Sequence, residues 1–63
     1  MRLSQLKVRL LMAKLEISQS TLAARAGISK QTMSAVMNGR NCRPELLGKI
    51  SKALDVDPEE IIE

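Results

Sequence analysis

The chain has 63 residues, of which 44% are hydrophobic and none is aromatic, and its formal net charge is +3. A chain of this length buries only about 60% of its extended surface, so we expect one domain, residues 1–63, with a core of aliphatic side chains and methionine. The absence of histidine and the single cysteine exclude the common zinc sites, Ser-His-Asp and Cys-His catalytic groups, and an internal disulfide. We therefore expect no enzymatic activity, no metal, no cofactor and no small-molecule ligand.

Charge is distributed unevenly along the chain. Residues 1–43 contain eight Lys or Arg and one acid, whereas residues 44–63 contain two Lys and six acids. A basic N-terminal part favours a polyanionic partner, although a solvated charged surface would explain the same composition. No apolar stretch approaches the roughly 20 residues of a membrane span, and the N-terminus lacks the core of a signal peptide. We therefore expect a cytoplasmic protein without a membrane partner.

The first predicted element is an amphipathic helix over residues 3–15. Apolar residues recur there at helical spacing, and one stripe consists of Leu3, Leu6, Leu10 and Ala13. A wider arc adds Val8, Leu11, Met12 and Leu15. Because this arc is broad, we expect the helix to pack against two neighbours.

Two short helices are predicted on either side of Gly27. Ser18 is placed to cap the first of them, and Gly27 supplies the left-handed backbone that ends it. Ser29 is placed to cap the second, which runs over residues 30–38 and ends at Asn-Gly. The small side chain of Ala23 lets the two helices pass close to each other. Their shared core face consists of Leu22, Ala23, Ala26, Ile28, Met33 and Val36.

The C-terminal third predicts two further helices after a polar loop over residues 40–43. Pro44 suits the first position of a helix that ends at Asp55-Val56, with a core stripe of Leu47, Ile50, Ala53 and Leu54. The run D-P-E-E from Asp57 is a strong start signal for a last short helix carrying Ile61 and Ile62. The sequence therefore predicts an all-α, compact five-helix fold.

A family resemblance follows from the residues around the turn. The spacing of Gln19, Ala23, Gly27 and Met33 resembles the helix-turn-helix of lambdoid phage repressors and Cro proteins, the Cro/C1-type or XRE family. Asn-Gly after the third helix, Arg43-Pro44 and the segment K-A-L-D-V-D-P-E-E-I-I extend the likeness over residues 3–62. The resemblance implies a five-helix, lambda-repressor-like domain whose third helix enters the major groove of double-stranded DNA while the second lies across the backbone.

The resemblance also implies which residues contact DNA. Gln31 can pair with adenine N6 and N7, Lys30 can reach guanine O6 and N7 or a phosphate, and Ala35 can meet a thymine methyl. The implied base-reading set is Lys30, Gln31, Thr32, Ser34 and Ala35. The implied phosphate contacts are Gln19, Ser29, Asn38, Arg40, Asn41 and Arg43. Three alternatives stay open: Gln19 can be merely solvated, Ser29 can be only a cap, and Thr32 can contact base or phosphate.

Many relatives carry an ion pair where this chain has Met12 and Met37, and we expect these two methionines to touch instead. Cys42 lies in the basic loop. It is either a tolerated small residue or a redox-sensitive thiol whose pKa Arg40 and Arg43 would lower.

The expected function is sequence-specific regulation of transcription by a repressor that binds a two-fold symmetric operator. Its partners would be double-stranded DNA and a second copy, paired in solution or only on DNA. The candidate dimer surface is Leu46, Val56, Glu59 and Ile62. The alternative is a protein-interaction module of the same fold, such as an antitoxin or antirepressor, that docks through its acidic C-terminal face.

Overall fold

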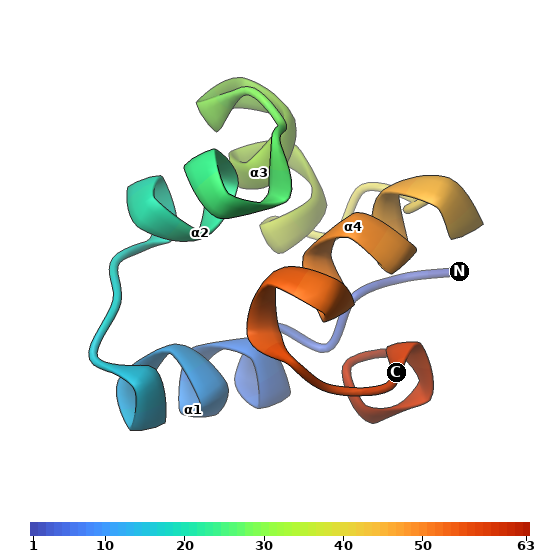
Figure 1. Ribbon diagram of the computed structural model, residues 1–63. Coiled ribbons are helices and arrows are strands. Elements are labelled where there is room, and N and C mark those ends of the chain that lie inside the picture. Colours follow the sequence, from blue (N-terminus) through green and yellow to red (C-terminus); the bar gives the residue numbers. More distant parts are fainter.

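The computed structural model describes residues 1–63 and contains four α-helices and one turn of 3-10 helix, with no strands (Figure 1). The elements are α1 (Gln5–Leu15), α2 (Gln19–Ala26), α3 (Lys30–Met37), α4 (Pro44–Leu54) and η1 (Pro58–Glu60). The all-α class is confirmed. None of the helices has the length and apolar content needed to cross a membrane.

The expected fifth helix is wrong. After Asp57 the chain makes one 3-10 turn, stabilised by a hydrogen bond of 2.8 Å from the Asp57 N–H to Glu60 Oε2. It then extends, because Ile61 is fully buried and Ile62 pairs with Leu3 in an isolated antiparallel bridge. A helix continuing through these residues could not make that pairing.

The pairing of the two chain ends also sets where α1 begins. The Ser4 N–H donates to the Ile61 carbonyl at 2.7 Å, and Glu63 N–H donates to the Arg2 carbonyl at 3.0 Å. Leu3 is therefore extended and buried, and Ser4 caps α1 by accepting from the Lys7 N–H at 3.2 Å. The helix starts two residues later than the sequence indicates.

The core draws apolar side chains from all four α-helices and from both chain ends. The stripes predicted for α2, α3 and α4 are buried, with Ala53 only half-buried and Ile28 half-buried in the turn. Its members are Leu3, Val8, Met12, Leu22, Ala23, Ala26, Met33, Val36, Met37, Cys42, Leu47, Ile50, Leu54 and Ile61. Met12 and Met37 are both in this core, at 9% and 4% exposure, and a direct contact between them stays a prediction.

The orientation of α1 differs from the expectation. Val8 and Met12 face the core, whereas Leu6 and Leu10 are 68% and 61% exposed and Ala13 is exposed. The expectation of a broad buried arc on this helix is therefore wrong at Leu6, Leu10 and Ala13. The physical reason is that α1 lies at one edge of the molecule, with the rest of the protein on one side only (Figure 1).

Candidate nucleic-acid interface

The turn between α2 and α3 is three residues long and is fixed by backbone hydrogen bonds. Gly27 has φ of 71°, in the left-handed region, and its N–H donates to the Ala24 carbonyl at 3.2 Å. The N–H of Ile28 donates to the Ala23 carbonyl at 3.0 Å, which completes a Schellman motif. Ser29 then caps α3, so the predicted Gly27 and Ser29 roles in the turn are confirmed.

The inner face of α3 is fixed to the core, which leaves its outer face free. Met33 and Val36 are 0% and 2% exposed, and Ala23 on α2 is 1% exposed. On the outer face, Lys30 and Gln31 are exposed and Ser34 and Ala35 are partly exposed. The division of α3 into an inner and an outer face follows the predicted one.

The two helices begin in the same way. At α2, Ser18 Oγ accepts from the Thr21 N–H at 3.1 Å and donates to Thr21 Oγ1 at 3.0 Å. At α3, Ser29 Oγ accepts from the Thr32 N–H at 3.0 Å and donates to Thr32 Oγ1 at 2.8 Å. The side chains of Ser29 and Thr32 are thus held together at the N-terminus of α3.

Two hollows flank α3, and together they are lined by nine of the eleven residues implied to contact DNA. The smaller, of about 230 Å³, is lined by Gln19, Ser20, Lys30 and Ser34. The larger, of about 370 Å³, is lined by Gln31, Thr32, Ala35, Val36, Arg40, Asn41, Arg43 and Leu46. The structure therefore brings the N-termini of α2 and α3 together on one side, and α3 and the loop after it on the other.

The other two residues lie outside these hollows. Ser29 acts as the cap of α3, as described above. Asn38 is the exposed C-cap, one residue beyond the end of the helix, and its Nδ2 donates to Ser34 Oγ at 3.5 Å. The helix predicted to include Asn38 thus ends at Met37.

The loop after α3 is tied to the N-terminus of the chain. The Met1 ammonium donates to Asn41 Oδ1 at 2.6 Å, and the Cys42 N–H donates to the Met1 carbonyl at 2.7 Å. Sequence reasoning missed Met1, because no local pattern links residues so far apart. It also missed Ser20, although its place in the first turn of α2, next to Gln19, was a usable signal.

Cys42 does not have the properties of a reactive thiol. Its side chain is fully buried, and its Sγ donates to the Arg43 carbonyl at 3.7 Å. Burial raises the pKa of the thiol, and the positive charge of the N-terminal ammonium only partly offsets this rise. The expectation that Arg40 and Arg43 would lower this pKa is wrong, because loss of hydration outweighs the nearby positive charge.

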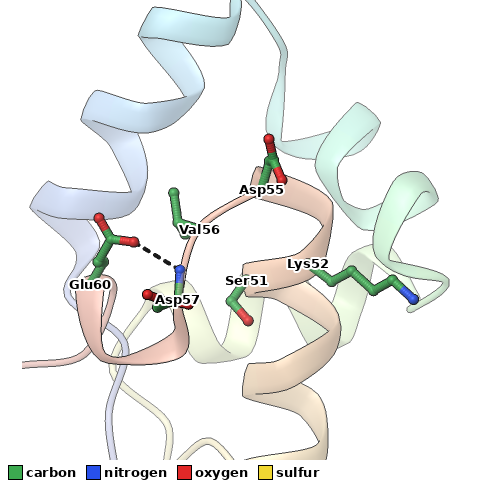
Figure 2. Close-up of a pocket in the computed structure, with 6 residues that line it drawn as sticks. All are labelled: Ser51, Lys52, Asp55, Val56, Asp57 and Glu60. Atoms are coloured by element: carbon green, nitrogen blue, oxygen red, sulfur yellow. Dashed lines mark hydrogen bonds between the residues drawn. The ribbon is translucent and has the colours of Figure 1, made fainter.

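A third hollow, of about 400 Å³, lies where α4 meets η1 and has the opposite charge (Figure 2). Asp55, Asp57 and Glu60 line it together with Ser51, Lys52 and Val56. Lys52 points away from the carboxylates in Figure 2. No group of side chains in the chain is arranged to bind a metal ion. This hollow is therefore an acidic surface, separate from the exposed face of α3.

Comparison with known proteins identifies the family. Two structures of PhpD, one native with cadmium atoms and one with cadmium and hydroethylphosphonate, share the fold with a TM-score of 0.83 at 19% identity. They match all of this chain, which covers 14% of theirs. No curated protein sequence matches the chain. The model of the Cro/C1-type HTH DNA-binding domain matches residues 7–63, and the chain therefore belongs to this family of DNA-binding domains.

Proposed function

We propose that this chain acts as a sequence-specific transcriptional regulator, a repressor, that places α3 in the major groove of double-stranded DNA. The observation that supports this most strongly is the outer face of α3. It is polar, it is not covered by the rest of the protein, and hollows lined by cations and hydrogen-bonding side chains flank it on both sides. A helix with such surroundings can enter the major groove while the side chains on both sides of it contact the phosphates.

The side chains on the outer face of α3 contact the bases. Gln31 is exposed and offers a paired donor and acceptor for adenine, and Lys30 offers donors for guanine. Ser34 and Ala35 follow one turn later, where a hydroxyl and a methyl can meet base edges. Thr32 is partly exposed and contacts either a base or a phosphate.

The residues on the two sides of α3 contact the phosphates. Gln19 lies in the first turn of α2, where unpaired N–H groups and the helix dipole favour an anion. Arg40 and Arg43 are exposed cations on the other flank, with Asn41 between them, and Asn38 follows α3 directly. Ser29 contributes through the N-terminus of α3, which its side chain caps.

Two-fold symmetric operators require two copies, and we propose that residues 1–63 act as one domain in a homodimer formed in solution or only on DNA. The candidate contact surface is Leu46, Val56 and Ile62, whose side chains are half-buried, together with Glu59, which is exposed. A second candidate function is supported by the acidic hollow at the end of α4. There, the same fold would bind a basic protein partner, as an antitoxin or antirepressor would.

The salt dependence of DNA binding separates these two functions. Titration of a labelled duplex followed by fluorescence anisotropy should show log K falling by about 0.9 per phosphate contact for each unit of log salt. With about six contacts, affinity should fall on the order of 10³-fold between roughly 50 and 200 mM salt. Arg40→Ala should weaken binding to all sequences alike and reduce the slope by about one contact. Lys52→Ala, which removes a cation at the acidic hollow, is the matched control and should change neither the affinity for DNA nor the salt slope. No binding at low salt would favour the protein-interaction module.

A further inference from the structure

The outer surface of α1 is apolar, although the helix already packs against the core through its other side. Leu6 and Leu10 are 68% and 61% exposed, and Ala13, one turn further, is also exposed. The core side of the same helix is provided by Val8 and Met12. We call the stripe of Leu6, Leu10 and Ala13 the outer face of α1.

Single exposed leucines are common on proteins, but this arrangement is more specific. The three side chains occur at positions i, i+4 and i+7, so they form one continuous row along the helix. This is the spacing at which two helices pack against each other. The row does not stabilise the fold, because its side chains point away from the core.

The charged side chains within α1 itself are all basic, and the exposed acid that follows, Glu16, caps the C-terminus of the helix. The helix contains Lys7, Arg9 and Lys14 and no acid. With about 3.6 residues per turn, Arg9 falls on one side of the row and Lys7 and Lys14 fall on the other. Lys7 donates to the Ile62 carbonyl at 3.3 Å, whereas Arg9 and Lys14 are exposed and have no hydrogen-bond partner. The outer face is thus an apolar row between two basic edges.

This charge pattern limits what can cover the row. If α1 of a second copy packed here about a two-fold axis, basic edges would meet basic edges, which is unfavourable. A helix with its own apolar row between acidic edges would complement both the shape and the charge. The location also matters, since α1 and α3 lie at opposite ends of the molecule in Figure 1.

We propose that the outer face of α1 is a docking site for an amphipathic helix with acidic edges, supplied by a partner protein. Docking leaves α3 uncovered, so the protein can carry this partner while it is bound to DNA. Leu6 and Leu10 provide the apolar contact, and Arg9 and Lys14 provide the complementary charge. The site is distinct from the acidic hollow at the end of α4, which would attract a basic partner.

The test uses two labelled synthetic helices of about 18 residues, long enough to form some helix alone. Both carry leucine at positions i, i+4, i+7 and i+11; one has glutamate and the other lysine along the edges. Fluorescence anisotropy with the full chain should show binding of the glutamate peptide and at least about tenfold weaker binding of the lysine peptide. Leu10→Ser and Lys14→Glu should each weaken binding of the glutamate peptide by about tenfold. Lys49→Glu, at an exposed position of α4, is the matched charge control and should have no effect.

Circular dichroism confirms that each variant is folded, and Leu10 is exposed enough that its replacement should leave the helix content unchanged. No binding of the glutamate peptide up to about 1 mM would overturn the proposal. Equal binding of both peptides would overturn it too, because charge would then play no part. Sedimentation that shows self-association abolished by Leu10→Ser would assign the face to a second copy instead. Binding to vesicles of anionic phospholipid that Leu10→Ser abolishes, with no peptide binding, would assign it to a membrane surface.

Discussion

Replacing Gly27 with alanine isolates what the turn between α2 and α3 requires of the backbone. Gly27 has φ of 71°, and a Cβ added there would meet no atom within 4 Å. No clash therefore contributes to the effect of Gly27→Ala. What remains is the cost of a left-handed conformation for a residue with a Cβ, about 1–2 kcal/mol, less about 0.4–1 kcal/mol from reduced freedom of the unfolded chain. The expected result is a loss of about 1 kcal/mol of stability.

Gly48 provides the matched control, because the same substitution there should have the opposite sign. Gly48 lies inside α4, and a Cβ added to it also meets nothing within 4 Å. Alanine is favoured over glycine in a helix interior by roughly 1 kcal/mol, so Gly48→Ala should stabilise the protein.

Thermal unfolding followed by circular dichroism measures both variants. A change of 1 kcal/mol shifts Tm by about 4–8 °C in a domain of this size, so Gly27→Ala should melt several degrees lower and Gly48→Ala several degrees higher. The double variant should return close to the original Tm, because the two effects are independent. A Gly27→Ala variant that melts at or above the original temperature would refute the backbone explanation of the turn.

Three further outcomes are expected. Met12→Arg or Met37→Glu alone should destabilise the protein by about 3 kcal/mol, and the double variant should recover much of that loss; melts of the double no better than the singles would contradict a direct Met12–Met37 contact. Ala23→Leu should lower the free energy of unfolding by about 1–3 kcal/mol in urea titrations, because Ala23 is only 1% exposed between packed helices; an unchanged midpoint would show that space is available. Cys42 should be alkylated by iodoacetamide at least about tenfold more slowly in the folded protein than in denaturant, because its thiol is buried with a raised pKa, and equal rates would contradict this.

Sequence alone predicted the elements whose signals are local. Ser18 and Ser29 each cap a helix by accepting a hydrogen bond from the N–H of the threonine three residues later. Gly27 ends α2, and Pro44 begins α4. Each of these signals depends on residues within about one turn of helix, so the chain reveals it without knowledge of the fold.

The expectations that were wrong depend on contacts between distant residues. Helical spacing in α1 indicated one broad apolar arc, and only the fold determines that Val8 rather than Leu6 faces the core. The 3-10 turn in place of a fifth helix follows from the pairing of Leu3 with Ile62, at opposite ends of the chain. Burial of Cys42 likewise depends on the fold, and its N–H is bonded to Met1. Local residue types cannot show such pairings.

The candidate site was more predictable than the core because its residues are consecutive on α2, α3 and the loop that follows. Their order along the chain determines which side chains share the outer face of α3, once Met33 and Val36 are assigned to the inner face. What the sequence did not show is that Ser20 joins Gln19 and Lys30 in one hollow.

The central claim is that α3 selects DNA sequence through its exposed side chains, and selection from random duplexes tests it most directly. The full chain should enrich one family of sites, and Gln31→Ala should still bind DNA but lose its preference at one base pair of that site, by about 1–3 kcal/mol. A Gln31→Ala variant that enriches the same site with undiminished preference at every position would contradict the claim.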